Sequence, residues 1–449
     1  MRYVVRADGD VSESFASGHG VLAGDSASPI LWIIFMCDLI FPDDPDDVSL
    51  NNVPVSHLEQ ADDIVLFSLK LRILEAWCAI NFLCINVKKS SGMLFGPIPR
   101  SRPVLTLLGS PLAWTESYTY VGVTLQSTHR NIFARHYEAK ARKGRSVAHV
   151  TLGLKSMVGR LPPREGTHLY MARVDPHLIH ACDIIPDVDL SLLAQLEAVQ
   201  VTFLRRLLGL SACSMRAFLS TETGLEPLQY RRIRLLLRFL KYALASTDHL
   251  IYHAVQSSLA LARAHCPCWI SDVVWVASSM ATSLQSQLNT SPLALLPNGR
   301  PAASPVLRLR EYLQVPIPEH RLALTRLVLA DHCLAEVRLR WAERYRASVP
   351  RDSRLCRFCE ECVETPVHAL FECVADEQLC VLRREFLADM LFHMPSLRED
   401  TVGMSNIEAL RHLLQLRKTL PLLARFTHAV LKVFAIRAPA LFLNGTLAV

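Results

Sequence analysis

The sequence predicts an α/β fold over roughly the first 125 residues, followed by a mostly α-helical region that contains a small cysteine-rich module. Short β-branched runs alternate with helical stretches before residue 125, and from about residue 130 leucine, alanine and arginine dominate. β-Branched runs favour strands, whereas apolar residues spaced every three or four positions favour helices.

Composition and charge narrow the class of protein. The chain has 449 residues, 51% hydrophobic and 20% charged, so it is globular and long enough for two or three domains. A net charge of +6 is compatible with nucleic-acid binding without indicating it. The start lacks the apolar segment of a secretory signal, and the strongest apolar run, 29–41, is too short to span a bilayer. We expect an intracellular protein, nuclear or cytoplasmic, not secreted and without a membrane partner, whose 13 cysteines are reduced or metal-bound.

The elements of the α/β part follow from local patterns. One helix should begin after Ser28-Pro29, because proline suits a first helical turn, and a second should cover 69–85. The strands expected from β-branched runs are 3–6, 53–60, 64–67, 93–96 and 118–125.

The later part should be helical with interruptions. Prolines in 159–166 and 223–230 lie at or just before expected helix starts. Segment 283–318 is richer in Ser, Pro and Asn and is expected to be a linker or a loop-heavy connection. The expected helices are 131–158, 164–182, 190–208 and 226–246, with more between 319 and 349.

The stretch QADDIVLFS (60–68) places two adjacent carboxylates, Asp62 and Asp63, between two expected strands. Aspartate is common in turns, so the dipeptide alone is explained by ordinary turn chemistry. A hairpin tip also presents both carboxylates on a rigid support, and phosphoryl transfer by divalent cations needs such hard oxygen ligands. The sequence around the pair decides between the two interpretations.

Four stretches in order supply that context: GVLAGDSASPILW (20–32), QADDIVLFS (60–68), INVKKSSGMLFG (85–96) and YTYVGVTL (118–125). Together they resemble the palm of the reverse transcriptases of non-LTR (LINE-like) retrotransposons. The resemblance implies a partial polymerase palm, with a mixed or antiparallel sheet and helices, in an RNA-directed DNA polymerase. It also implies Mg²⁺ as cofactor, and an RNA template and a DNA primer, or their hybrid, as partners.

By the same resemblance, Asp62 is the catalytic carboxylate that binds magnesium and Asp63 is its less essential neighbour. Strand 120–125 corresponds to the primer grip. The loop that approaches template and nucleotide corresponds to Gly24, Asp25 and Ser26. One of two lysines, Lys88 or Lys89, approaches the nucleotide phosphates.

Two departures from the family pattern matter. Ser26 stands where a proline is more usual, which is a mild change. The family's first palm motif supplies a second metal-binding carboxylate, and the acids upstream of residue 18 lie in a hairpin-like stretch that does not match it: Asp8, Asp10 and Glu13. We therefore expect the C-terminal portion of a reverse transcriptase, truncated before the first palm motif and catalytically incompetent alone.

A second constellation is CRFCEECVETPVHALFEC (356–373). Its Cys3His set has a spacing that fits tetrahedral zinc, which can staple a module with little core of its own. Cys362 and Cys380 are spare thiols, either of which can replace a ligand, and a cluster of buried cysteines is the alternative without metal. The motif also resembles the C-terminal zinc-knuckle region of non-LTR elements. The expected ligands are Cys356, Cys359, His368 and Cys373.

Two segments carry clustered cations. The first forms one face of an expected helix, with spacings of 3, 4 and 3, at Arg231, Arg234, Arg238 and Lys241. The second follows the palm, where a thumb holds duplex, at Lys140, Arg142, Lys143 and Arg145. A basic stripe binds phosphates, whereas a solvated face paired with acids elsewhere is the structural alternative.

The expected domain order is a partial reverse transcriptase palm (1–127), a helical thumb-like or connection region (128–282), a linker with helices (283–350), a CCHC zinc knuckle (351–380) and C-terminal helices (381–449). Two hypotheses follow. The first is a retrotransposon-derived reverse transcriptase fragment that binds nucleic acid. The second is a non-catalytic, nucleic-acid-binding, helical zinc-knuckle protein in which the Asp62–Asp63 pair is a residual turn.

Overall fold

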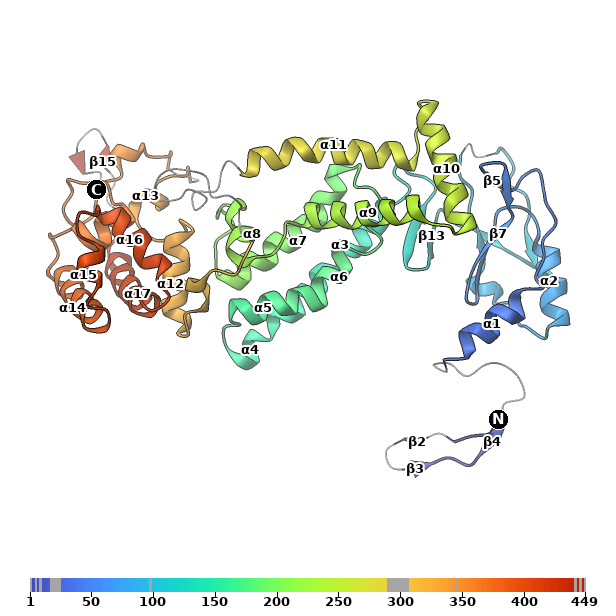
Figure 1. Ribbon diagram of the computed structural model, residues 1–449, viewed down its shortest axis with the longest axis horizontal. Coiled ribbons are helices and arrows are strands. Elements are labelled where there is room, and N and C mark those ends of the chain that lie inside the picture. Colours follow the sequence, from blue (N-terminus) through green and yellow to red (C-terminus); the bar gives the residue numbers. More distant parts are fainter. Residues whose placement is uncertain are drawn as a thin grey trace. The chain divides into compact units, whose positions relative to one another are not determined.

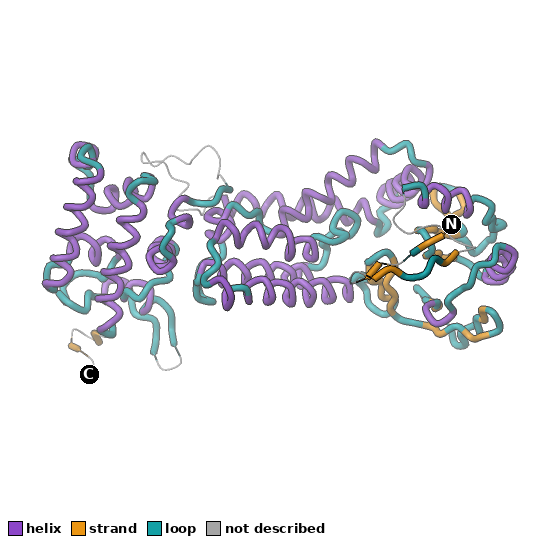
Figure 2. Tube along the Cα trace, turned by 90° about the horizontal axis from the view of Figure 1, so that it is seen from below, coloured by secondary structure: helices purple, strands orange, loops and turns teal. Residues whose placement is uncertain are grey.

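The computed structural model of the chain is mixed α/β and mostly helical (Figure 1). It forms two compact units, residues 1–136 with 240–272, and residues 137–239 with 273–449. Strands gather before residue 127, apart from one short pair near the C-terminus (Figure 2). The structure describes residues 2–4, 6–7, 10–16, 26–96, 99–288, 307–343, 346–439, 442–443 and 446–447.

The core of the first unit lies between two helices and a hairpin. α1 (Ser28–Met36) includes Ser28-Pro29 in its first turn, although the helix was expected to begin after them, and α2 (Leu71–Ile80) lies within the expected 69–85. Between them β7 (His57–Gln60) pairs antiparallel with β8 (Asp63–Leu66). Ile64 and Leu66 are two positions apart on β8, so their side chains point to the same face, and they pack against the buried core of both helices. The hairpin therefore rests on a hydrophobic base while its tip faces outward.

The other strands of this unit are short. Within the described ranges every sheet has two strands, so the structure does not show the larger sheet expected of a palm. The expected strand 118–125 is a hairpin, because Val121 and Gly122 adopt positive φ and reverse the chain. The pairs are β1 (Arg2–Tyr3) with β4 (Phe15–Ala16), β2 (Arg6–Ala7) with β3 (Asp10–Val11), β5 (Val48–Leu50) with β6 (Val53–Val55), β9 (Ser91–Gly92) with β12 (Ala113–Trp114), β10 (Thr106–Leu107) with β11 (Ser110–Pro111), and β13 (Ser117–Tyr120) with β14 (Val123–Gln126).

Most of the later elements are helices, as the composition predicts. α7 illustrates why: Asp189 caps its first turn, Gly209 ends it in the left-handed conformation, and its leucines bury one face. The elements between residues 134 and 288 are α3 (Ala134–Gly153), α4 (Lys155–Val158), α5 (Pro163–Leu169), the π-helical turn η2 (Tyr170–Val174), α6 (Asp175–Leu178), α7 (Leu190–Leu208), α8 (Ala217–Thr223), α9 (Leu228–Ala245), α10 (His249–Arg263) and α11 (Trp269–Leu288).

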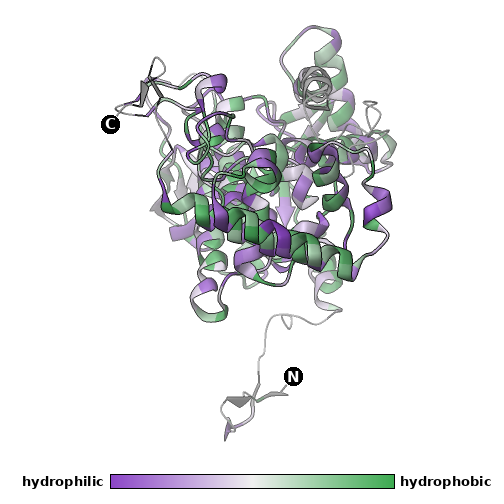
Figure 3. Cartoon of the chain, turned by 90° about the vertical axis from the view of Figure 1, so that its left-hand side faces the viewer, coloured by the Kyte–Doolittle hydropathy of each residue, from purple (hydrophilic) through white to green (hydrophobic). Residues whose placement is uncertain are grey.

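The remaining elements belong to the second unit, where α12 and α14 both pack on α17. Hydrophilic and hydrophobic residues alternate along the long helices, so each buries one side (Figure 3). Among the described residues, no helix combines the length and the apolar character that crossing a membrane requires. The elements are η3 (Glu311–Gln314), α12 (Pro318–Val328), α13 (Ala335–Arg338), η4 (Arg351–Ser353), the π-helical turn η5 (His368–Glu372), α14 (Glu377–His393), α15 (Leu397–Asp400), α16 (Asn406–Gln415), α17 (Leu420–Ile436), and the strand pair β15 (Phe442–Leu443) and β16 (Thr446–Leu447).

Candidate functional site

The acidic pair lies at the tip of the β7–β8 hairpin, as the sequence predicts. Gln60 pairs with Asp63, so Ala61 and Asp62 form a two-residue loop, with φ of +56° at Ala61. Trp32 of α1 donates a hydrogen bond from Nε1 to the Ala61 carbonyl at 2.8 Å, which fixes the tip from below. Both carboxylates are exposed.

The stretches that carry the resemblance contact one another in the first unit. Trp32 links the first stretch to the acidic tip. Tyr118 donates a hydrogen bond to the carbonyl of Lys89 at 3.4 Å, which links the fourth stretch to the third. Partial burial raises the pKa of Tyr120, and the charges of Asp63 and Glu59 raise it further, so Tyr120 of β13 lies within electrostatic range of the acidic hairpin.

The other residues that the resemblance assigns to the palm lie in turns or outside the described residues. Lys88 and Lys89 form an exposed turn. Ser26 is exposed just before α1, whereas Gly24 and Asp25 lie outside the described residues. Within the part of the chain that the structure describes, Asp62 and Asp63 belong to no group of three converging metal-ligand side chains.

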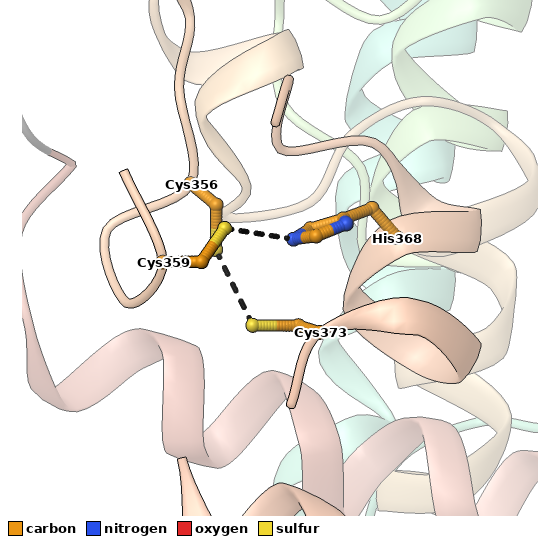
Figure 4. Close-up of side chains that lie close together, drawn as sticks. All are labelled: Cys356, Cys359, His368 and Cys373. Atoms are coloured by element: carbon orange, nitrogen blue, oxygen red, sulfur yellow. Dashed lines mark hydrogen bonds between the residues drawn. The ribbon is translucent and has the colours of Figure 1, made fainter. Parts of the chain in front are cut away.

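The Cys3His cluster is fully assembled. The candidate ligand atoms of all four residues lie within 4.8 Å of one another. The Sγ atoms of Cys356 and Cys373 are 3.8 Å apart, and Cys359 Sγ is 3.4 Å from His368 Nε2 (Figure 4). A tetrahedral site with Zn–S bonds of about 2.3 Å and Zn–N bonds of about 2.0 Å has ligand–ligand edges of roughly 3.5–3.8 Å. The donor set and its spacing therefore fit zinc.

Two local structures bring these ligands together. Leu355 pairs with Val363, and the Cys356 amide donates to the Cys362 carbonyl at 2.7 Å, which closes the knuckle around Cys359. On the other side the π-helical turn η5 carries His368 at its start and delivers Cys373 directly after its end. The side chains of the two pairs point toward one another (Figure 4). The spare thiols Cys362 and Cys380 lie outside the converging group.

Protonation in the metal-free cluster follows from burial and hydrogen bonds. Burial raises the pKa of Cys356 to about 12. Burial also acts to raise the pKa of Cys359, but amide donors from Glu361 and Cys362 outweigh it, and the pKa is lowered. Burial lowers the pKa of His368, which favours the neutral imidazole that a metal requires.

A second layer of contacts orients His368. Its Nδ1 lies 3.7 Å from the Glu372 carboxylate, which accepts a hydrogen bond from Asn406 Nδ2 at 3.0 Å. A carboxylate behind a ligating histidine fixes its tautomer and raises its basicity. This partner follows from the four-residue spacing on one turn, which the sequence already contains.

Arg357, next to the ligand Cys356, is a buried clamp. Its guanidinium pairs with Glu364 at 2.6 Å and donates to the carbonyls of Cys333 at 2.9 Å and Phe434 at 2.5 Å. It also donates to the carbonyl of Arg437. The clamp thereby ties the Cys3His module to the end of α17. Its acceptors lie far apart in the chain, so local sequence carries no signal for it.

The basic residues divide into free and paired groups. On α3, Arg142, Lys143 and Arg145 are exposed, whereas partial burial lowers the pKa of Lys140. On α9, Arg231 pairs with Asp175 at 2.8 Å. The other charged positions of that stripe are Arg234, which pairs with Glu226 at 2.7 Å, and the exposed Arg238 and Lys241.

Sequence reasoning missed Arg232, which binds the buried Asp187 through Nε at 2.9 Å and Nη2 at 2.7 Å. The signal was present: Arg232 is in phase with Leu228 and Leu236, which are both buried. An arginine on the apolar face of a helix needs a buried acid.

Comparison with known proteins agrees with the resemblance to reverse transcriptases, at the level of origin. Over 221 residues the chain is 25% identical to the RNA-directed DNA polymerase from mobile element jockey of Drosophila funebris. The match covers 46% of this chain and 24% of that relative, so the chain spans well under half of the relative's length. No family model matches. This weak similarity supports a reverse-transcriptase-like origin.

Proposed function

We propose that the chain derives from the polymerase of a non-LTR retrotransposon, comprises part of the palm and the region after it, and binds nucleic acid. The observation that carries the proposal is that hydrogen bonds join the described part of the first palm-like stretch to the acidic hairpin and the fourth stretch to the third, with Tyr120 within electrostatic range of Asp63. The similarity to the jockey polymerase supports it from the sequence side.

In this proposal Asp62 binds Mg²⁺ and Asp63 assists electrostatically. Magnesium supplies charge stabilisation for the primer 3′-oxygen and the triphosphate during nucleotide transfer. Asp62 and Asp63 provide one side of such a site from a rigid hairpin tip, and a two-metal centre also needs a carboxylate from a facing strand. We infer that the chain alone binds a primed template without extending it.

The zinc knuckle and the basic helices hold the nucleic acid. Zinc bound by the Cys3His cluster stabilises the module, because four converging ligands exist only in the folded state. The exposed cations of α3, with Arg238 and Lys241 of α9, contact phosphates. Arg231 and Arg234 are held by acids within the chain and contribute less.

The test combines primer extension with binding. The zinc-loaded chain is mixed with a primed RNA template and Mg²⁺, and both extension and fluorescence anisotropy are followed. We expect binding that weakens steeply as salt rises, and no extension. Extension that Asp62→Ala abolishes contradicts the inferred lack of catalysis. Absence of binding at low salt contradicts the function itself.

The second candidate is a non-catalytic zinc protein in which the Asp62–Asp63 pair is a residual turn. The contrast between a complete Cys3His cluster and an exposed acidic pair favours it. Mn²⁺ titration followed by NMR line broadening separates the candidates. Broadening at residues 60–64 that Asp62→Asn removes supports the polymerase-derived site, and unchanged signals there support the residual turn.

A further inference from the structure

A cavity of about 530 Å³ opens within the second unit, and none of the four Cys3His residues lines it. Its walls come from α12, α17 and the loop after α12, with one side formed by Lys155 of α4 and by Arg160. α12 and α17 lie side by side (Figure 1). The volume falls in the range of small-molecule sites, which is roughly 300–1,000 Å³.

One buried polar side chain of the lining has an unsatisfied atom. His332 is 5% exposed, and its Nδ1 is buried without a hydrogen-bond partner in the described chain. Burial lowers the pKa of His332 to about 4, so the ring is neutral and carries one donor and one acceptor. The Nδ1 atom is shielded, so a ligand in the cavity contacts the small part of the His332 side chain that stays exposed.

The charged side of the cavity is cationic. Lys155, Arg160 and Lys432 form no ion pair with any carboxylate of the described residues. Two other charged residues of the lining are already engaged: Arg326 donates to the Gly209 carbonyl at 3.0 and 2.9 Å, and Asp331 accepts from the Ser211 amide at 2.7 Å. The exposed Glu319 adds one carboxylate, which the three cations outnumber.

The rest of the lining suits a planar, partly apolar group. Leu322 and Ala323 of α12 face Leu431 and Ala435 of α17 across the space. The His428 ring also lines it and lies 5.2 Å from the His320 ring. The cavity thus combines an apolar wall, a buried neutral imidazole and a group of cations at its mouth.

We propose that this cavity binds a nucleotide, with the base between the apolar wall and the imidazoles and the phosphate at Lys155, Arg160 and Lys432. A heterocyclic base is planar and can pack against the apolar wall and the imidazole rings, and a phosphate offers the charge that the cations need. The nucleotide is either free or one unit of a single strand, and the second case rests on the proposed nucleic-acid binding.

The experiment uses the full zinc-loaded chain and three probes: AMP, adenosine, and an oligo(A) RNA of about ten nucleotides. Binding is measured by calorimetry for the small probes and by anisotropy for the RNA. Leu431→Trp fills the cavity, and Lys432→Ala removes one cation. Lys418→Ala is the matched control, because Lys418 is exposed and outside the lining. Arg160→Ala tests the same charge if Leu431→Trp does not fold.

We expect AMP or the RNA to bind, Leu431→Trp to weaken that binding by at least about tenfold, and Lys432→Ala to weaken it by roughly fivefold. Lys418→Ala should leave it unchanged, and adenosine should bind more weakly than AMP. Cavity-dependent binding of AMP identifies a free nucleotide, and cavity-dependent binding of RNA alone identifies a unit of a strand.

Two results overturn the proposal: neither AMP nor RNA binds, or both bind the variants as well as the wild type. RNA binding that Leu431→Trp leaves intact, with no AMP binding, overturns the cavity site while the proposed function stands. If AMP binds in the cavity and RNA does not bind, the cavity site is supported and the proposed nucleic-acid binding is contradicted.

Discussion

Arg232→Met is expected to destabilise the second unit severely. Arg232 is 3% exposed and Asp187 is 7% exposed, and three hydrogen bonds join them. Methionine keeps the length of the side chain but leaves the Asp187 carboxylate with only the Tyr137 hydroxyl as partner, at 2.5 Å, among the described residues. Removing one partner of a buried ion pair costs about 3–5 kcal/mol. The Tm should therefore fall by about 6–20 °C, at about 2–4 °C per kcal/mol.

The assay is urea unfolding followed by far-UV circular dichroism at pH 7. Arg234→Met is the control, because Arg234 is exposed and its pair with Glu226 is worth at most about 1 kcal/mol. A variant that combines Arg232→Met with Asp187→Leu removes the stranded charge and should recover most of the lost stability. The reasoning is refuted if Arg232→Met unfolds within about 1 kcal/mol of the wild type, or if the double variant is no more stable than the single one.

Three further outcomes are expected. Glu372→Gln should weaken zinc binding by about 10–100-fold in competition with a chromophoric chelator, with exposed Glu377→Gln unchanged. His332 has a folded pKa of about 4, below the unfolded value near 6.5, so its contribution to stability is complete above pH 6.5 and is lost as pH falls toward 4. That loss is roughly 3 kcal/mol, and unfolding curves of His332→Gln should show a correspondingly smaller decline between these pH values. Replacing Arg142, Lys143 and Arg145 by alanine should reduce the slope of log K against log salt by about 2–3, and an unchanged slope rules out phosphate contacts on α3.

Local patterns predicted the elements whose signals are local. α7 covers Leu190–Leu208, as its leucine spacing predicts, and α9 covers Leu228–Ala245 within the expected 226–246. The convergence of the four Cys3His side chains followed from spacing in the same way, because a knuckle and one helical turn fix where the candidate ligand atoms lie.

What the sequence left open depends on distant partners or on backbone geometry. The π-helical turn η2 interrupts the expected helix 164–182, and residues 93–96 are a loop after β9 instead of a strand. α10 and most of α11 lie within the expected helical region 128–282, but no bounds were predicted for either helix, and much of the expected linker 283–318 lies outside the described residues. Arg232 could not be assigned to Asp187, which is 45 residues away, and the link from Arg357 to the Phe434 carbonyl spans 77 residues.

The Arg357 clamp has a thermodynamic consequence. Arg357 follows Cys356 of the Cys3His cluster and donates to the carbonyls of Cys333 and Phe434. The residues next to these two in the chain, His332 and Ala435, line the proposed nucleotide cavity. Metal and nucleotide should therefore act as linked ligands. Any factor by which zinc improves nucleotide affinity must equal the factor by which nucleotide improves zinc affinity. Through the Arg357 guanidinium, the affinity measured at one site should change when the other site is occupied.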